Sequence, residues 1–244
     1  MSEASVMISV NFARPFPVFP LDGVVLLPHA LLRLFIFEPR YRQMVEAVLD
    51  GSGQIAMGVF RGEGWREDYE GMPAIRDTVC VGQIAHHEKL PDGTYRIWLH
   101  GVCRARVVEE FEPDGERLYR QAMLNPVGAT ETPEQELLPV RERLMEMLRR
   151  PPLESLEPVK ALLAEEDERL VKGEPIPTSA LLEVVALSVL SRLEIPGLQY
   201  RLLEEGDILE RAAIIEDELR RFVGLLERVR VQMDPEAPRG VTWN

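Results

Sequence analysis

The side chains best suited to chemistry are histidines, cysteines and clustered acids, and their spacing decides which chemistry is open to them. His86, His87 and Glu88 stand side by side, and all three are common metal ligands. Adjacent residues of a strand point to opposite faces, so His86 and His87 are poorly placed to hold one ion. Cys80 and Cys103 lack the short spacing of a zinc site. We therefore predict no metal site and interpret residues 86–88 as solvated positions leading into a hairpin.

Nucleophilic catalysis has one candidate pair, Cys103 with His100. On a strand these two side chains fall on opposite faces, which separates the thiol from the base. The acidic runs at 109–116 and 165–169 have the composition of solvated loops and helix faces. None of the three lysines follows a glycine, which excludes a phosphate-cradling P-loop, and the chain has no G-x-S-x-G motif. We expect no catalytic residues and no cofactor, with an unrecognised enzyme as an alternative.

The composition narrows the range of partners and compartments. A net charge of −13 over 244 residues repels phosphate backbones on average, which disfavours nucleic acid as a partner. The longest apolar stretch, residues 180–193, contains Glu183 and Arg192 and falls short of the ~20 residues that span a bilayer. The N-terminus lacks the apolar segment of a secretory signal, and two cysteines in apolar surroundings fit a reducing compartment. We predict a cytoplasmic protein without a membrane partner.

The first half of the chain reads as strands. Prolines 17 and 20 interrupt the apolar residues 16–21, and because proline donates nothing to a ladder, we expect this segment at a sheet edge or paired along one side. Residues 30–37 and 53–60 are apolar runs of strand length. Between them, apolar residues recur at helical spacing over 41–48, which predicts a helix ending near residue 50.

The clearest strand signal is a hairpin around the turn at residues 91–93, whose Pro-Asp-Gly sequence suits a tight reversal. In its second strand, the odd positions from Tyr95 to Val107 are apolar or small. The even positions are wetter, and they include Arg96, Trp98, His100, Arg104 and Arg106. This alternation predicts one buried and one wetter face, as in an antiparallel sheet or a small barrel.

Beyond residue 126 the pattern changes to helices. The last helix has an apolar residue at alternating steps of four and three from Ile208 to Met233. We expect this row to pack inside the chain's own bundle, and self-association through the C-terminal helix is the alternative. The expected organisation is a β-rich lobe at 14–125, a helical lobe at 126–234 and a tail at 235–244.

Four segments in a fixed order carry a family resemblance: "PFPVFPLDGVVLLP", "LFIFEPRYRQMV", "VGQIA" and "LPDGTYRIWLHGVCRARV". They resemble the N-terminal substrate-binding domain of the ATP-dependent protease Lon, and "LSVLSRLEIPGLQYRLLEEGDILER" resembles its second lobe. The resemblance implies an α+β fold, with a mainly antiparallel, PUA-like pseudo-barrel followed by a helical bundle. The AAA+ and Ser-Lys peptidase modules of the protease have no counterpart in this sequence. We therefore expect a standalone, non-enzymatic protein of this family.

The segment "FEPRY" is the most specific of these motifs and lies where a strand becomes a helix. Pro39 restrains Glu38 to an extended conformation and suits the first helical turn. We expect Glu38 to pair with an arginine at this joint. Glu38, Pro39, Arg40 and Tyr41 are accordingly predicted to be a structural motif rather than a ligand site.

The family implies binding of unfolded or partner polypeptides, with a protease or a chaperone as a further partner. Exposed aromatic side chains commonly anchor interfaces. The expected contact residues are Trp65, Tyr69 and Met72 in the long loop and Trp98 on the wetter strand face. Packing of the loop on its own domain is the alternative for Trp65 and Tyr69.

A third function stays open by analogy of fold, because small β lobes also occur in RNA-binding proteins. The residues that would carry it are Arg96, Arg104 and Arg106, which share the wetter side of one predicted strand. Strong salt dependence would be its signature.

Overall fold

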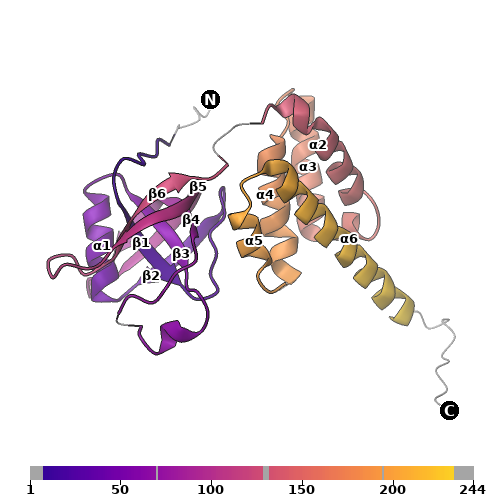
Figure 1. Cartoon of the computed structure of the whole chain (residues 1–244). Coiled ribbons are helices and arrows are strands. Elements are labelled where there is room, and N and C mark those ends of the chain that lie inside the picture. Colours follow the sequence, from indigo (N-terminus) through magenta and orange to yellow (C-terminus); the bar gives the residue numbers. More distant parts are fainter. Residues whose placement is uncertain (1–7, 70, 129–131, 194, 234–244) are drawn as a thin grey trace, which may run out of the picture. The chain divides into compact units, whose positions relative to one another are not determined.

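The computed structural model describes residues 8–69, 71–128, 132–193 and 195–233, with only the backbone described at 192 and 229–233. Its contacts divide the chain into two compact units. The first comprises the chain up to Glu131 and the segment Pro196–Asp207, and the second comprises Thr132–Ile195 and the chain from Ile208 onward. The strands lie in the first unit and most helices in the second (Figure 1), which confirms the α+β class.

The strands of the first unit form one sheet that closes into a ring. Their bounds are β1 Phe16–Leu21, β2 Leu31–Ile36, β3 Gln54–Val59, β4 Thr78–Lys89, β5 Tyr95–Phe111 and β6 Gln121–Pro126. The strand order is β2-β5-β4-β3-β1-β6, and β6 also pairs with β5. Strands β5, β4, β3, β1 and β6 therefore enclose a small barrel, and β2 is attached to β5 from outside the ring. Only the pairing of β1 with β3 is parallel among these neighbours.

The expectation that residues 16–21 lie at a sheet edge or pair along one side is wrong. Strand β1 lies between β3 and β6. Its two neighbours engage different parts of it: β6 pairs with Phe16 and Pro17, whereas β3 pairs with the stretch from Val18 to Leu21. Two partial ladders tolerate the prolines, because neither ladder needs a donor from every residue of the strand.

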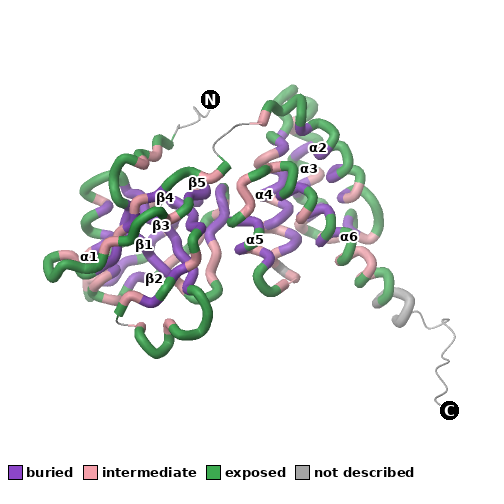
Figure 2. Tube along the Cα trace, in the orientation of Figure 1, coloured by how far each residue is buried: buried purple, intermediate pink, exposed green. Residues whose placement is uncertain are grey.

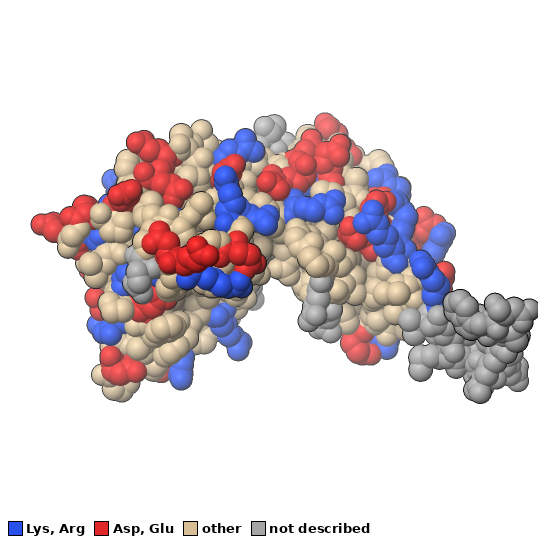
Figure 3. All heavy atoms as spheres, turned by 60° about the horizontal axis from the view of Figure 1, so that its bottom comes forward, with Lys and Arg blue, Asp and Glu red and all other residues tan. Residues whose placement is uncertain are grey.

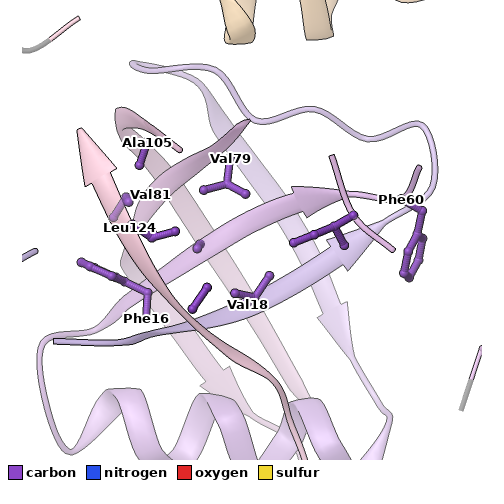
Figure 4. Packing of buried hydrophobic residues seen from close by; sticks show 10 residues of the cluster. Phe16, Val18, Phe60, Val79, Val81, Ala105 and Leu124 are labelled. Atoms are coloured by element: carbon purple, nitrogen blue, oxygen red, sulfur yellow. The ribbon is translucent and has the colours of Figure 1, made fainter. Parts of the chain in front are cut away.

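The core of the first unit fills the barrel. One cluster of buried side chains gathers residues from every strand of the ring: Phe16, Val18, Ala56, Phe60, Ile75, Val79, Val81, Ala105, Ala122 and Leu124. In Figure 4, Val79, Val81, Ala105, Leu124 and Val18 lie between the strands, with Phe60 at the edge of the group, and Figure 2 shows many buried positions along the strands. Helix α1 (Pro39–Leu49) buries Tyr41, Met44, Val45 and Val48, as its helical spacing predicts. The Tyr41 ring lies 4.4 Å from Phe19 of β1.

The alternation predicted for β5 holds only in its first half. Tyr95, Ile97 and Leu99 are buried, but the register with β4 shifts so that Val81 pairs with Cys103 and Gly82 with Gly101. This bulge inserts one residue and changes which side chains face inward. Arg104, expected on the wetter face, is consequently buried.

The sheet also binds a helix that begins about seventy residues after its last strand. Helix α5 (Leu198–Glu204) groups with the first unit rather than with the other helices of residues 126–234. The Arg104 Nε–H donates to the Leu202 carbonyl at 3.1 Å, and the Tyr200 hydroxyl accepts the Thr78 N–H at 3.0 Å. These hydrogen bonds fix α5 on β4 and β5.

The second unit is a bundle of helices. Their bounds are α2 Glu134–Leu148, α3 Glu157–Val171, α4 Thr178–Ser188 and α6 Ile208–Met233, with short 3-10 turns at Leu153–Ser155 and Leu190–Leu193. Helix α6 packs on α2 and α4 through buried Ala212, Ile215 and Leu219. Its later seam residues Phe222 and Leu226 are half-buried, whereas the side chains of Val229 and Met233 lie outside the described residues. Self-association through α6 stays a prediction.

Among the helices of the described residues, none combines the length and the apolar composition needed to cross a bilayer.

Candidate functional site

The joint between β2 and α1 is a network that anchors the long loop at residues 61–77. Glu38 accepts a hydrogen bond from Arg40 Nε at 3.0 Å and another from the Tyr69 hydroxyl at 2.5 Å. Arg40 donates to the Tyr69 carbonyl oxygen at 3.0 Å. Its guanidinium lies between two rings, 4.7 Å from Tyr41 and 4.6 Å from Tyr69. The expected pairing of Glu38 with an arginine is present, and its partner is Arg40.

Removing the Glu38 carboxylate should destabilise the first unit. We expect Glu38→Ala to cost about 1–3 kcal/mol, because Arg40 and Tyr69 would lose their acceptor where the Glu38 side chain is only 20% exposed. Thermal unfolding followed by calorimetry measures the loss. Glu63→Ala is the matched control, since Glu63 pairs with Arg66 at the surface, where ion pairs contribute little. An unchanged melting temperature for Glu38→Ala would contradict the structural role.

Burial raises the pKa of Tyr41 to about 12. The unfolded chain ionises this phenol near pH 10, whereas the folded chain keeps it neutral, so its stabilising contribution is complete below pH 10 and is lost as the pH rises towards 12. The two-unit difference corresponds to about 3 kcal/mol. Urea unfolding between pH 9 and pH 11.5 should show a steeper loss of stability for the natural protein than for Tyr41→Phe. Equal slopes would contradict this assignment.

The loop aromatics pack on their own unit. The Trp65 ring stacks on Phe60 with centroids 5.2 Å apart, and Tyr69 lies 6.3 Å from Phe60 and 5.9 Å from Trp65. Both also pack against the barrel core. Met72, the third predicted loop contact, is half-buried. The structure thus brings Trp65 and Tyr69 together as a support for the loop, and contact of this trio with a polypeptide stays a prediction.

A row of exposed apolar side chains lies on β2, outside the barrel ring. Leu31 is 56% exposed, Phe35 is 54% exposed, and Phe37, just after the strand, is 59% exposed. Arg33 lies between Leu31 and Phe35 on the same side and is exposed as well. Side chains of this size at this exposure in one row are typical of binding surfaces. We call the row Leu31, Arg33, Phe35 and Phe37 the β2 row.

Trp98 extends the β2 row across the sheet. It is the register partner of Arg33 on β2 and of His86 on β4, so the three side chains share one face. The Trp98 ring is half-buried and lies 4.7 Å from the His86 ring. Phe35 and Phe37 stack with centroids 6.0 Å apart. Of the four predicted contact residues, Trp98 is therefore the one that lies on this surface.

The catalytic alternative finds no support at its best candidate. Burial raises the pKa of the Cys103 thiol to about 11, so the thiolate that a nucleophile requires is scarce at neutral pH. Burial also lowers the pKa of His100, and its ring lies 6.5 Å from that of His29. Within the described residues, no group of three or more His, Cys, Asp or Glu side chains could hold a metal ion.

RNA binding through Arg96, Arg104 and Arg106 is not supported, because one of the three arginines is buried and another is held in an ion pair. Arg104 is buried beneath α5, and Arg96 lies 3.3 Å from Glu88 in an ion pair. On the face shown in Figure 3, basic and acidic side chains are intermixed. A phosphate-binding stripe along β5 is therefore not formed by Arg96, Arg104 and Arg106.

Residues 15–221 match the family described as "ATP-dependent protease La (LON) substrate-binding domain". The match covers well over half of the chain, so this protein belongs to that family. Within these 244 residues the match is to the substrate-binding domain alone. This result confirms the resemblance seen in the sequence motifs.

Several similar curated proteins are Lon proteases. That of Heliobacterium modesticaldum is 24% identical over 240 residues, covering 91% of this chain and 26% of the relative. That of Haemophilus influenzae is 27% identical over 223 residues, covering 89% and 24%. That of Escherichia coli is 30% identical over 125 residues, covering 50% and 15%. The chain thus spans at most about a quarter of the length of these relatives.

Two solved structures share the fold. The N-terminal domain of Mycobacterium avium complex Lon protease superposes with a TM-score of 0.57 at 16% identity. The Lon N-terminal domain protein from Xanthomonas campestris superposes with a TM-score of 0.50 at 20% identity. Each alignment covers 85% of this chain and 98% of the other. At these identities the likeness establishes the fold only.

Proposed function

We propose that this protein is a non-enzymatic polypeptide-recognition domain and that it binds unfolded segments on the β2 row together with Trp98. The single observation that carries the proposal is the row of exposed Leu31, Phe35 and Phe37 on a strand outside the barrel. Membership of a protease substrate-binding family supports the same class of ligand, because the substrates of a protease are polypeptides.

The physical basis is burial of apolar surface on a rigid platform. Large apolar side chains that stay exposed in the free protein gain stabilisation when a ligand covers them, at roughly 25 cal/mol per Å². The β2 row is held by six residue pairs with β5, so little conformational entropy is lost when a ligand binds there. An unfolded chain exposes apolar side chains of its own, whereas a folded protein buries most of them. The surface should therefore discriminate unfolded from folded polypeptides.

The further partners follow from that role. A domain that holds unfolded segments can pass them to a protease or a chaperone, and we include such a partner in the proposal.

Fluorescence anisotropy tests the function. Labelled α-lactalbumin, reduced and carbamidomethylated so that it cannot refold, should show saturable binding when titrated with this protein. The native, disulfide-bonded form is the control and should not bind. Equal binding of both forms, or binding of neither, would refute recognition of unfolded chains.

A further inference from the structure

The outer edge of β2 carries backbone groups without a strand partner. In the described part of the chain β2 pairs with β5 alone. The Gly101 N–H donates to the Ala30 carbonyl oxygen at 2.8 Å, and at the far end of the hairpin the Leu90 N–H donates to the Thr94 carbonyl oxygen at 2.9 Å. In an antiparallel sheet, the backbone N–H and C=O groups of successive residues point alternately to one neighbouring strand and to the other. Both bonds agree on this alternation for β5: its odd residues point to β2 and its even residues point to β4. Residues 95, 97 and 99 of β5 therefore bond to β2, and residues 96 and 98 bond to β4.

The same alternation decides which backbone N–H and C=O groups of β2 point away from β5. Leu32, Leu34 and Ile36 oppose Leu99, Ile97 and Tyr95, and they use their N–H and C=O groups on β5. The intervening residues Leu31, Arg33 and Phe35 direct theirs to the open edge. These are the same residues whose side chains form the exposed β2 row. An added strand would thus find hydrogen-bond partners and side-chain contacts at the same three positions.

Arg33 specifies the charge of the occupant. It is exposed, and no ion pair holds it among the described residues, although the whole chain carries a net charge of −13. Its flanking neighbours on the row, Leu31 and Phe35, are apolar. A side chain opposite Arg33 should therefore be acidic, and the side chains opposite its two neighbours should be apolar.

We infer that β2 binds an extended polypeptide segment as an added antiparallel strand, and that the preferred segment carries an acidic residue between two apolar residues at alternating positions. This inference rests on the proposed function and names the substrate class and binding mode of the same surface. The alternating spacing follows from the strand, because residues that share one face are two positions apart.

Binding of labelled peptides tests whether the segment is added to β2 as a strand. The reference peptide alternates valine, threonine, aspartate, threonine and valine. Its two valines and its aspartate then face the β2 row, and its threonines face the opposite side. In an antiparallel added strand, the residues opposite Leu31, Arg33 and Phe35 direct their N–H groups at β2, so N-methylation of the valine and aspartate nitrogens should weaken binding by about tenfold or more. N-methylation of the intervening threonines is the matched control, since their N–H groups point away, and it should leave affinity within about twofold.

A charge reversal tests the preference. The aspartate peptide should bind about tenfold more tightly than its lysine counterpart, and Arg33→Glu should invert that order. Arg33 is exposed, so unfolding curves of Arg33→Glu should match those of the natural protein.

Equal effects of the two methylation patterns, or equal binding of the two charge forms, would overturn the inference. If unfolded α-lactalbumin binds and the peptides do not, strand addition is wrong and the proposed function stands. If neither binds, both are wrong.

Discussion

Replacing Phe35 and Phe37 together with serine is expected to weaken binding of carbamidomethylated α-lactalbumin by about tenfold or more. The two rings are 54% and 59% exposed in the free protein and stack on each other, so a bound chain would bury most of their remaining apolar surface. A loss of about 1–2 kcal/mol for each ring sums to about 2–4 kcal/mol, which exceeds the roughly 1.4 kcal/mol of a tenfold change in affinity. Anisotropy titrations of the variant and the natural protein measure it.

The control uses two exposed apolar side chains in the other unit. Leu170 is 47% exposed and Val171 is 90% exposed at the end of α3 in the second unit, so serine at both positions removes apolar surface without touching the β2 row. Binding of this control should match the natural protein, and both variants should keep their unfolding temperatures. Equal weakening by the two variants would show that any exposed apolar surface suffices, which contradicts a defined site.

Gly101→Ala is expected to produce the largest loss of stability, about 3 kcal/mol. A methyl group at Gly101 would lie 2.1 Å from the Leu27 carbonyl oxygen and 3.2 Å from the Pro28 Cα, and both are backbone atoms that cannot rotate away. The Gly101 N–H and C=O also bond to Ala30 and His29. The alanine would therefore push the segment before β2 off β5, an overpacking cost at the upper end of its usual range.

Calorimetry should show a drop of roughly 6–12 °C for the transition of the first unit in Gly101→Ala. Gly64→Ala is the control, because nothing lies within 4 Å of a methyl group placed there. Its melting temperature should stay within about 1 °C of the natural value. A small effect at Gly101 would mean that the segment at residues 27–30 does not depend on this close approach.

The sequence predicts regular elements well where one local signal dominates. The hairpin around residues 91–93 and the helix after Pro39 follow from turn chemistry and from apolar spacing, and both are present as β4-β5 and α1. The position of β1 between two strands does not follow from its prolines, because a strand can divide its length between two partial ladders. Likewise, a bulge opposite Val81 and Gly82 changes the facing of β5 in a way that strict alternation misses.

Contacts between residues far apart in the chain further limit what the sequence predicts about the fold. Nothing near residues 198–204 indicates that this helix joins the strands instead of the bundle, since its partners Thr78 and Arg104 are about one hundred residues away. The barrel closure between β5 and β6 is similarly non-local.

The candidate site was only partly predictable. Trp98 is placed correctly on the wetter face by alternation alone. The β2 row was missed, because residues 30–37 read as one apolar run. A signal was nevertheless present: Arg33 alternates with Leu31, Phe35 and Phe37, and a charge at one of these positions indicates that their common side faces solvent. For Trp65 and Tyr69 the sequence does not distinguish contact with a partner from packing within the domain, because aromatic side chains in a loop often pack on their own domain.

Hydrogen–deuterium exchange on the natural protein, with and without carbamidomethylated α-lactalbumin, shows which segment a bound polypeptide covers. We expect slower exchange in peptides covering residues 31–37, whose outward amides at Leu31, Arg33 and Phe35 would acquire a partner. We expect no change over the loop at residues 61–77 or over α2, α3 and α4. Protection confined to that loop or to those helices, with residues 31–37 unchanged, would contradict binding at the β2 row. Protection of the loop would make Trp65, Tyr69 and Met72 the leading candidates for contact residues.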